Sequence, residues 1–372
     1  MAKICTSIGI ISGTSMDGVD VALLRSDGVA LEELGPTATY PLPEADRALL
    51  RRAMAAARQD QGARTDPAIA EAERAVNATH EAAVRRFVSD HGVPLHKVDC
   101  VGFHGQTIFH APERGVTVQL GDGAALARRL GRPVAWDFRS ADMAAGGEGA
   151  PLVPVYHQAL ALRMGQSLPI AFVNIGGVAN LTYVGEDGTL IAFDTGPGNA
   201  PIDDLVRARL GRGFDADGEL SDQGSPDKAL LEEWMRHPFF ARPAPKSLDR
   251  DDFTLEGLDR LTTQDAAASL AAFCVAAIAR GTELFPAPCR TFVVCGGGRR
   301  NRGLMRLLAE ALAPAEVAPA ESFGFDGDAV EAQAFAYMAL RVAEGLPLTF
   351  PGTTGVQAPM PGGRWSEPVT VD

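Results

Sequence analysis

The sequence predicts an α/β protein of two domains, and three observations carry this prediction. Aliphatic, strand-like segments alternate with amphipathic helical segments along most of the chain, which is the pattern of α/β folds. A strand, a polar glycine-containing turn and a second strand occur at Ile8–Ser26 and again at 170–184. The length of 372 residues favours two domains over one.

The individual elements follow from residue types and their spacing. The segments "IGIIS" and "VDVALL" flank the first turn and are rich in aliphatic residues typical of strands. Ala, Arg and Glu at helical spacing predict helices within 44–90, ending near Gly92. Further strands are predicted in 30–43 and at the start of 98–112, and a loop follows the second of these. Segments in which a strand is followed by a helix are predicted in 115–131, 133–161, 169–211 and 290–313. A last amphipathic helix is predicted in 326–345.

We expect residues 1–138 to form the first domain and residues 139–349 to form the second. The C-terminal tail, 350–372, is expected to pack back on the first domain. Ligands of such proteins tend to lie in the cleft between domains.

Composition restricts the classes of function. Hydrophobic residues make up 46% and charged residues 22%, so packed cores are expected rather than disorder. The net charge of −13 disfavours nucleic acid and anionic membrane as partners. Five cysteines without a CxxC pair are interpreted as reduced core thiols of a cytoplasmic protein. We expect no signal peptide, and the longest apolar run, 266–279, is expected to be a buried helix.

The first turn, "SGTSMDG", brings hydroxyls, a carboxylate and two glycines together. Glycines let the backbone approach a ligand, and consecutive amide N–H groups form a concave anion site. Ser12, Thr14 and Ser15 add hydroxyl donors, and Asp17 is a candidate for a metal or its waters. The turn is not a Walker A loop, because it lacks GK[ST] and a strand follows it. An ordinary polar hairpin is the open alternative.

Two further glycine turns and one carboxylate follow strands. "NIGGVAN" and "CGGGRRN" place glycines where a nucleotide could lie against backbone, although each is weak evidence alone. In "FDTGPGN", Asp194 ends an apolar strand, where a carboxylate is costly unless it is used or hydrogen-bonded. We interpret Asp194 as a general base. The alternative is an Asx-turn, in which the carboxylate caps its own loop.

Other polar side chains gather in three motifs. "FHGQTIFH" and "DFRSADMAAGGEGAP" hold groups that suit a hydroxyl-rich or amide-bearing ligand: His104, Gln106, Asp137, Arg139, Ser140, Asp142 and Glu148. Zinc is not expected, because the histidines lack a third ligand at suitable spacing, and structural hydrogen bonding is their alternative role. "VQLGDG" adds Gln119 and Asp122 at a strand end. Glu331 is interpreted either as a surface charge on its helix or as a support for catalysis.

In this order the motifs resemble those of the anhydro-N-acetylmuramic acid kinase family, which belongs to the sugar kinase/Hsp70/actin superfold. The resemblance runs from about Ile8 to Gly355 through "SGTSMDGVD", "FHGQT", "QLGDG", "DFRSAD", "AGGEGAPLVP", "NIGGVAN", "FDTGPGN" and "CGGGRRN". One departure is Glu148, where we expect the family to carry Gln. The implied fold is two RNase H-like domains with an interdomain cleft.

The resemblance also implies a role for each motif. The first turn would grip the ATP phosphates, "NIGGVAN" would be the matching turn of the second domain, and "CGGGRRN" would hold the adenosine. The implied ATP-binding residues are Gly13, Thr14, Ser15, Met16, Asp17, Gly18, Val19, Asp20, Gly176, Gly177, Gly296, Gly297, Gly298 and Asn301. The implied catalytic residues are Asp194 and Glu331, and the substrate-side candidates are Gln119, Asp122, Arg139 and Asp142. Mg²⁺ is implied together with ATP, and its ligands are left open.

The family's substrate is 1,6-anhydro-N-acetylmuramic acid, in which O6 is tied to C1. The resemblance implies that Asp194 deprotonates a water that attacks C1, and that O6 takes the γ-phosphoryl group of ATP. The products would be N-acetylmuramate 6-phosphate and ADP, in peptidoglycan recycling. The alternatives are a kinase of an open amino sugar and a non-metabolic ATPase switch of the same superfold. A homodimer is left open.

Overall fold

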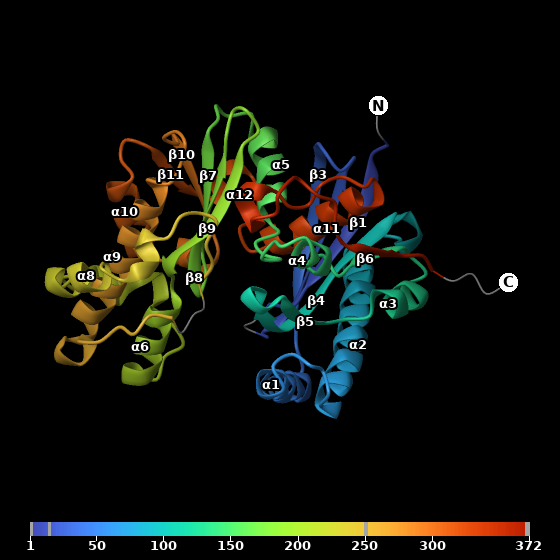
Figure 1. Cartoon of the computed structure of the whole chain (residues 1–372), viewed down its shortest axis with the longest axis horizontal. Helices are drawn as coiled ribbons and strands as arrows, with labels where there is room; N and C mark the ends of the chain where they lie inside the picture. Colours follow the sequence, from blue (N-terminus) through green and yellow to red (C-terminus); the bar gives the residue numbers. More distant parts are fainter. Residues whose placement is uncertain (1–2, 14–15, 249–251, 369–372) are drawn as a thin grey trace. The chain divides into compact units, whose positions relative to one another are not determined.

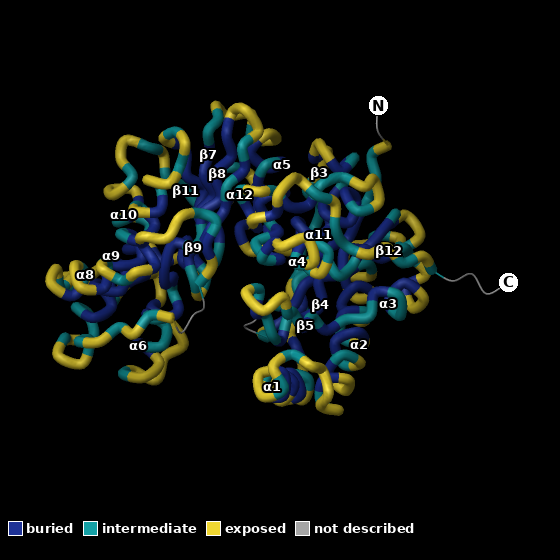
Figure 2. Tube along the Cα trace, in the orientation of Figure 1, coloured by how far each residue is buried: buried dark blue, intermediate teal, exposed yellow. Residues whose placement is uncertain are grey.

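The computed structural model of the chain describes residues 3–13, 16–248 and 252–368 (Figure 1). Its internal contacts divide the chain into two compact units. Unit 1 comprises Met1–Arg163 and Ala329–Asp372, and unit 2 comprises Met164–Asp328. Each unit has its own β-sheet, and the buried residues in Figure 2 concentrate on the strands and on the helices packed against them.

The sheet of unit 1 has the order β12-β6-β4-β1-β2-β3, with β5 paired to β4. Its strands are β1 (Cys5–Ile11), β2 (Gly18–Ser26), β3 (Leu31–Pro41), β4 (Cys100–Ala111), β5 (Val116–Leu120), β6 (Val134–Trp136) and β12 (Arg364–Ser366). The first three strands are antiparallel neighbours, and β4 and β6 continue the sheet in parallel with β1. The predicted first hairpin is therefore confirmed, with Ile11 opposite Asp20 next to the turn.

The sheet of unit 2 repeats this arrangement in the order β11-β10-β7-β8-β9. Its strands are β7 (Ile170–Ile175), β8 (Val178–Val184), β9 (Leu190–Pro197), β10 (Thr291–Cys295) and β11 (Glu316–Pro319). Strands β7, β8 and β9 are antiparallel neighbours, and β10 and β11 extend the sheet in parallel with β7. Both units thus have the strand order of an RNase H-like domain, which confirms the predicted second copy of the first hairpin's architecture.

The helices of unit 1 cover its sheet. They are α1 (Glu44–Gln59), α2 (Pro67–Asp90), α3 (Gly123–Leu130), α4 (Ser140–Ala144), α5 (Pro154–Met164), α11 (Val330–Ala343) and α12 (Pro351–Thr354). Helix α11 lies very close to the sheet, because glycines face it. A Cβ atom on Gly9 of β1 would lie 1.9 Å from the carbonyl oxygen of Ala332, and one on Gly102 of β4 would lie 1.9 Å from that of Phe335. These two positions fix α11, and with it Glu331, over β1 and β4.

The helices of unit 2 are α6 (Ala200–Leu210), α7 (Glu219–Gln223), α8 (Lys228–Trp234), α9 (Thr263–Thr282) and α10 (Arg302–Ala311). Helix α9 is the central core helix, and Phe273, Cys274 and Ile278 on it are buried. This helix is long and apolar enough to cross a membrane, but 67% of its apolar window is buried inside the structure. The prediction of a buried core helix is confirmed.

Two features differ from the sequence expectations. The later residues of 98–112, predicted to form a loop, continue strand β4 to Ala111, because β5 pairs with them beyond a bulge at His104. The unit boundaries lie at 163/164 and 328/329, whereas 138/139 and 349/350 were expected. The boundary at 328/329 arises because α11 packs on the unit 1 sheet, a tertiary contact that the chain order does not reveal. The tail does lie on unit 1, where β12 pairs with β6.

The prediction of core thiols is confirmed for four of the five cysteines, whereas Cys5 is only partly buried. All five cysteines are free, and four of them, Cys100, Cys274, Cys289 and Cys295, are buried. Burial raises the pKa of each of these four thiols to about 12. They are therefore thiols rather than reactive thiolates at neutral pH.

Candidate active site

The first turn of unit 1 is held by the bulged part of strand β4. Gly105 has φ of +72°, and a Cβ atom there would lie 2.0 Å from the carbonyl oxygen of Leu120. The backbone N–H of Ser12 donates to Gly105 O, and Gln106 Nε2 donates to Gly13 O at 3.2 Å. These two hydrogen bonds hold the first turn, which is the predicted phosphate-binding turn, against the "FHGQT" segment of β4.

The predicted ATP-binding residues of the first turn differ from one another in exposure and backbone conformation. Thr14 and Ser15 lie outside the described residues. Met16 has φ of +53°, a conformation uncommon outside glycine and a frequent mark of functional turns. Asp17 is exposed, and its backbone carbonyl accepts from Leu42 N.

The residues after the turn belong to β2. Gly18 is required by packing, because a Cβ atom would lie 2.6 Å from Thr39 Cγ2 on β3. Val19 is fully buried in the unit 1 core, so its side chain cannot contact nucleotide. Asp20 Oδ1 accepts a 2.6 Å hydrogen bond from Thr39 Oγ1.

Strands β4 and β5 carry a group of buried polar atoms without hydrogen-bond partners among the described residues. They are Gln106 Oε1, Thr107 Oγ1 and both amide atoms of Gln119, and Arg139 Nε joins them. Thr107 and Gln119 are directly opposite in the β4–β5 ladder. A buried polar group that is left unpaired costs about 1–3 kcal/mol, so such a group in a native protein calls for an explanation such as a ligand. We define these four residues as the orphan cluster.

Arg139 is held in place by the backbone and by a histidine. Its Nη1 donates to Gly149 O at 2.8 Å, and Nη2 lies 3.2 Å from His104 Nε2. His104 Nδ1 lies 3.0 Å from Gly105 O, so the proton on Nδ1 leaves Nε2 to accept from Arg139. Burial and the Arg139 charge lower the pKa of His104 to about 3, and this keeps the ring neutral as the contact requires. Burial also lowers the pKa of Arg139 to about 10.

Two other substrate-side candidates have structural roles. Asp142 is buried, and its oxygens accept from Gly149 N at 2.7 Å and from Thr354 Oγ1 at 2.7 Å. Asp122 is the N-cap of α3, where its side chain accepts from Ala125 N. These bonds give both carboxylates a structural role, and the substrate-side assignment of all four residues stays a prediction.

Glu331 stands in the first turn of α11, beside Asp20 and Arg139. Its side chain is exposed, yet the surrounding protein raises the pKa of the carboxyl by desolvation. The Asp20 charge raises the pKa further, whereas Arg139 lowers it. Glu331 therefore belongs to the same region of unit 1 as the first hairpin and the orphan cluster, and it is not an isolated surface charge.

The second and third glycine turns lie against each other in unit 2. Gly176 O accepts from Asn199 N at 2.7 Å, so the turn after β7 also contacts the start of α6. Gly296 has φ of +74°, and a Cβ atom there would lie 2.5 Å from Asn174 Oδ1. A Cβ atom on Gly298 would lie 2.3 Å from Ile175 Cγ2, so this glycine too is required by packing against β7.

Two glycines instead face open space. A Cβ atom on Gly297 would meet nothing within 4 Å, and one on Gly177 would have only the Ala200 Cβ atom, at 3.6 Å. Backbone without side chains is therefore presented to solvent at both turns, as expected where a phosphate or a nucleoside approaches the main chain.

The triple-glycine turn has further supports. Asn301 is the N-cap of α10, with Oδ1 accepting from Leu304 N, and its buried Nδ2 has no partner in the described part of the chain. Arg299 Nη1 donates to Gly296 O at 2.9 Å, and its guanidinium also pairs with Glu321 and Asp328. These two carboxylates raise the pKa of Arg299 against the effect of burial. Arg299 was not among the predicted site residues, although it follows the glycines directly.

Asp194 lies in β9, opposite Asn180 of β8, at a bulge of that ladder. Its backbone N–H donates to Lys246 O at 2.9 Å, and its Oδ2 accepts from Leu248 N at 2.9 Å. The carboxylate is thus oriented by a segment far away in the sequence. An Asx-turn, the alternative interpretation, involves only neighbouring residues and so does not account for this bond. The general-base role of Asp194 stays a prediction.

The described side chains do not form a complete metal-binding site by themselves. Among the described residues there is no group of three His, Cys, Asp or Glu side chains that could hold an ion. Mg²⁺ is commonly bound by one or two carboxylates together with substrate phosphates. The neighbouring carboxylates of Asp20 and Glu331 fit that requirement, because their mutual repulsion would be relieved by a cation.

Two sheets with the RNase H-like strand order place the chain in the sugar kinase/Hsp70/actin superfold. The family model described as anhydro-N-acetylmuramic acid kinase matches residues 5–364. The chain belongs to the anhydro-N-acetylmuramic acid kinase family.

Curated relatives agree with this assignment. The chain is 52% identical over 364 residues to an anhydro-N-acetylmuramic acid kinase from Rhodopseudomonas palustris (strain BisB18), covering 98% of this chain and 100% of that protein. It is 49% identical to one from Caulobacter vibrioides, covering 96% and 97% of the two chains.

Two solved structures match the chain at low sequence identity. Component A of the Acidaminococcus fermentans (R)-2-hydroxyglutaryl-CoA dehydratase is 10% identical with a TM-score of 0.49, covering 91% of this chain and 99% of that chain. A glucokinase of the ROK family from Streptomyces griseus is 14% identical with a TM-score of 0.39, covering 90% and 99%.

Proposed function

We propose that the protein uses ATP to open 1,6-anhydro-N-acetylmuramic acid hydrolytically and to phosphorylate its O6. The observation that carries the proposal is the family match over residues 5–364. The products are N-acetylmuramate 6-phosphate and ADP, and the setting is peptidoglycan recycling in the cytoplasm.

The residues of unit 2 suit the nucleotide and the base. The open backbone at Gly177 and Gly297 allows phosphate or nucleoside to approach the main chain. The unpaired Nδ2 of Asn301 is a donor for the adenosine. Asp194, oriented by Leu248 N, is the base that takes a proton from water as the water oxygen attacks C1.

The bond changes balance with one base. The new C1–O bond forms as the C1–O6 bond breaks, and O6 forms a bond to the γ-phosphorus while the bond from that phosphorus to ADP breaks. A glycosidase protonates its leaving oxygen with a second carboxyl group. In this reaction the phosphoryl group takes the place of that proton, so a dedicated general acid is unnecessary.

The residues of unit 1 suit the sugar and the metal. The orphan cluster offers amide, hydroxyl and guanidinium groups, which match the hydroxyl and acetamido groups of an amino sugar. Asp20 and Glu331 would hold Mg²⁺, which would offset negative charge on the ATP phosphates. His104 keeps Arg139 in position for the sugar.

A coupled assay of ADP release tests the proposal against a kinase of open amino sugars. The anhydro-sugar and open N-acetylmuramate are supplied in parallel with ATP and Mg²⁺. We expect turnover on the anhydro-sugar. Turnover on the open sugar alone would support the plain kinase, and ATP hydrolysis without either sugar would support an ATPase switch.

A further inference from the structure

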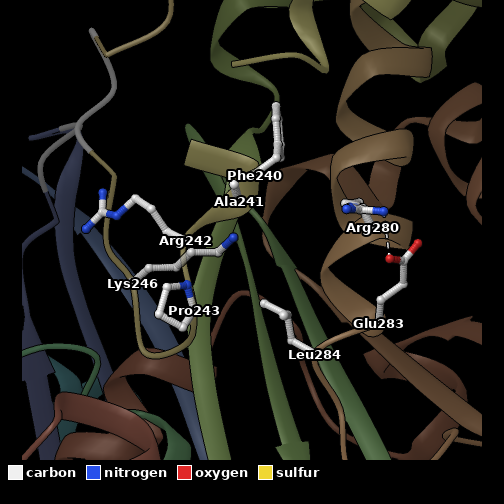
Figure 3. A pocket seen from close by; sticks show the side chains of 8 residues that line it. All are labelled: Phe240, Ala241, Arg242, Pro243, Lys246, Arg280, Glu283 and Leu284. Atoms are coloured by element: carbon white, nitrogen blue, oxygen red, sulfur yellow. Dashed lines mark ion pairs between the residues drawn. The ribbon is translucent and has the colours of Figure 1, made fainter. Parts of the chain in front are cut away.

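Unit 2 contains a hollow of about 350 Å³ that the proposed reaction does not use (Figure 3). It lies between the loop after the short helix η4 (Pro238–Ala241) and the C-terminal end of α9. Figure 3 shows Lys246 on the loop side and Arg280 on the helix side, with Leu284 below them. The hollow is lined by both polar and apolar side chains.

Lys246 is the unusual residue of this hollow. It is only 5% exposed, and its Nζ donates to Phe239 O at 3.3 Å. The Nζ atom also lies 4.5 Å from the ring centroid of Phe239 and 5.9 Å from that of Phe193. Among the described residues, no carboxylate lies within 4.0 Å of Nζ. A buried ammonium without a counter-charge is costly, so an anion from solution would stabilise it.

The neighbouring charges make the hollow electropositive. Burial lowers the pKa of Lys246, and the charges of Arg242 and Arg280 lower it further. Within the described ranges of the chain, Glu283 is the one acidic residue that lines the hollow, and it pairs with Arg280 at 2.8 Å. Three cations therefore face one carboxylate that is already engaged. This excess of positive charge stands out in a chain of net charge −13.

The remaining walls are apolar, with Phe240 and Leu284 among them. A ligand with a charged end and a compact, less polar body fits such a mixed lining better than a free inorganic ion does. We propose that this hollow of unit 2 binds a small organic anion, whose carboxylate or phosphoryl group contacts Lys246 and whose body contacts the apolar wall.

The site is distinct from the proposed base but is connected to it through the backbone. Lys246 Nζ contacts Phe193, whereas the adjacent residue Asp194 points its side chain to the other face of the strand. The carbonyl of Lys246 accepts from Asp194 N, and Leu248 N donates to Asp194 Oδ2. A ligand on Lys246 would therefore lie directly behind the segment that orients Asp194.

The chain has four lysines, so their signals can be resolved by NMR. We would label the lysine Cε positions of the full-length protein with ¹³C and assign Lys246 by the signal lost in Lys246→Met. Inorganic phosphate and D-lactate would be titrated separately, without nucleotide or sugar, so the result does not depend on the proposed function. We expect a saturable shift of the Lys246 signal, and a rise of its pKa toward 10.5 when the anion is bound.

Calorimetry then measures the contribution of Lys246. Loss of a charge-assisted contact predicts a reduction in anion affinity of about tenfold or more in Lys246→Met. The control is Lys228→Met, an exposed lysine of the same unit, which should bind as the wild type does. Binding of lactate alone would identify a carboxylate ligand, and binding of phosphate alone a phosphoryl ligand. No shift of Lys246 with either anion at tens of millimolar would overturn the proposal.

Discussion

Unit 1 and unit 2 have the same order of five strands, and they differ in what their turns and edges carry. We call these five strands the shared frame. In unit 1 the strands β5 and β12 extend the shared frame, and β5 and β4 carry residues of the orphan cluster. In unit 2 the frame is not extended, and glycine turns leave backbone open at Gly177 and Gly297. The comparison teaches that the shared frame fixes the positions of the turns, whereas added strands and glycines decide the chemistry.

The largest effect is expected at Asp194 of unit 2, the proposed general base. Asp194→Asn keeps the shape but removes the proton acceptor, so kcat should fall by on the order of 10² to 10⁴. Steady-state rates on the anhydro-sugar and a titration with ATP measure the two properties separately, and ATP affinity should stay within about twofold. Asp187→Asn in the exposed β8–β9 turn is the matched control. Near wild-type turnover of Asp194→Asn would remove this residue from the role.

The next effect concerns the orphan cluster of unit 1. Gln119→Leu keeps the approximate size but removes two buried polar atoms that lack partners. We expect KM for the sugar to rise about 10- to 100-fold, with the thermal midpoint unchanged or raised. Sugar titration and thermal unfolding of the same variant check both outcomes. A lower midpoint with an unchanged KM would instead make Gln119 part of the fold alone.

A pair of adjacent glycines separates packing from ligand approach in unit 2. Gly298→Ala forces a Cβ atom against Ile175 and should reduce the free energy of unfolding by about 1–3 kcal/mol. Gly297→Ala has open space, so its stability should match the wild type while its ATP affinity decreases. Chemical unfolding and nucleotide titration distinguish the two. Equal ATP affinity in Gly297→Ala and the wild type would argue against a nucleotide at this turn.

The last prediction is a pH dependence of stability that arises from buried histidines of unit 1. Burial lowers the pKa of His80 to about 4 and that of both His104 and His157 to about 3. The unfolded chain therefore binds protons more readily than the folded one between these values and about 6.5. This stability is fully present above pH 6.5 and is lost as the pH falls toward 3. Hydrogen exchange should show unit 1 opening first on acidification, and earlier loss of protection in unit 2 would contradict this.

Much of the frame could be predicted from the sequence, because it depends on local signals. Strand-like segments on either side of glycine-containing turns predicted both hairpins, and the order of the motifs predicted the family. The extension of β4 was missed because Gly105 and polar residues follow the apolar run, and only the pairing of Gln106 with Leu120 on β5 shows that the strand continues. The place of α11 was missed because its contacts with Gly9 and Gly102 join distant parts of the chain.

The parts of the candidate site that consist of glycine-containing turns could be predicted from the sequence. The roles of side chains whose partners lie far away in the sequence could not be predicted as well. The hydrogen bond from Thr354 to Asp142, for example, joins residues more than two hundred positions apart and could not be predicted from either motif. Thr107 was passed over, and its only signal would have been its place opposite Gln119 in a hairpin that the sequence analysis did not foresee.

The central claim is that one base, Asp194, directs one water to C1 while O6 is phosphorylated. The 1,6-anhydro bridge lies on the β face of the sugar, so O6 leaves from that face and water must arrive from the opposite one. Proton NMR of the anomeric signal, recorded before mutarotation, tests this most directly. The account predicts that the α anomer of N-acetylmuramate 6-phosphate forms first. An initial β anomer would contradict it, because that outcome requires two inversions through a covalent glycosyl-enzyme intermediate.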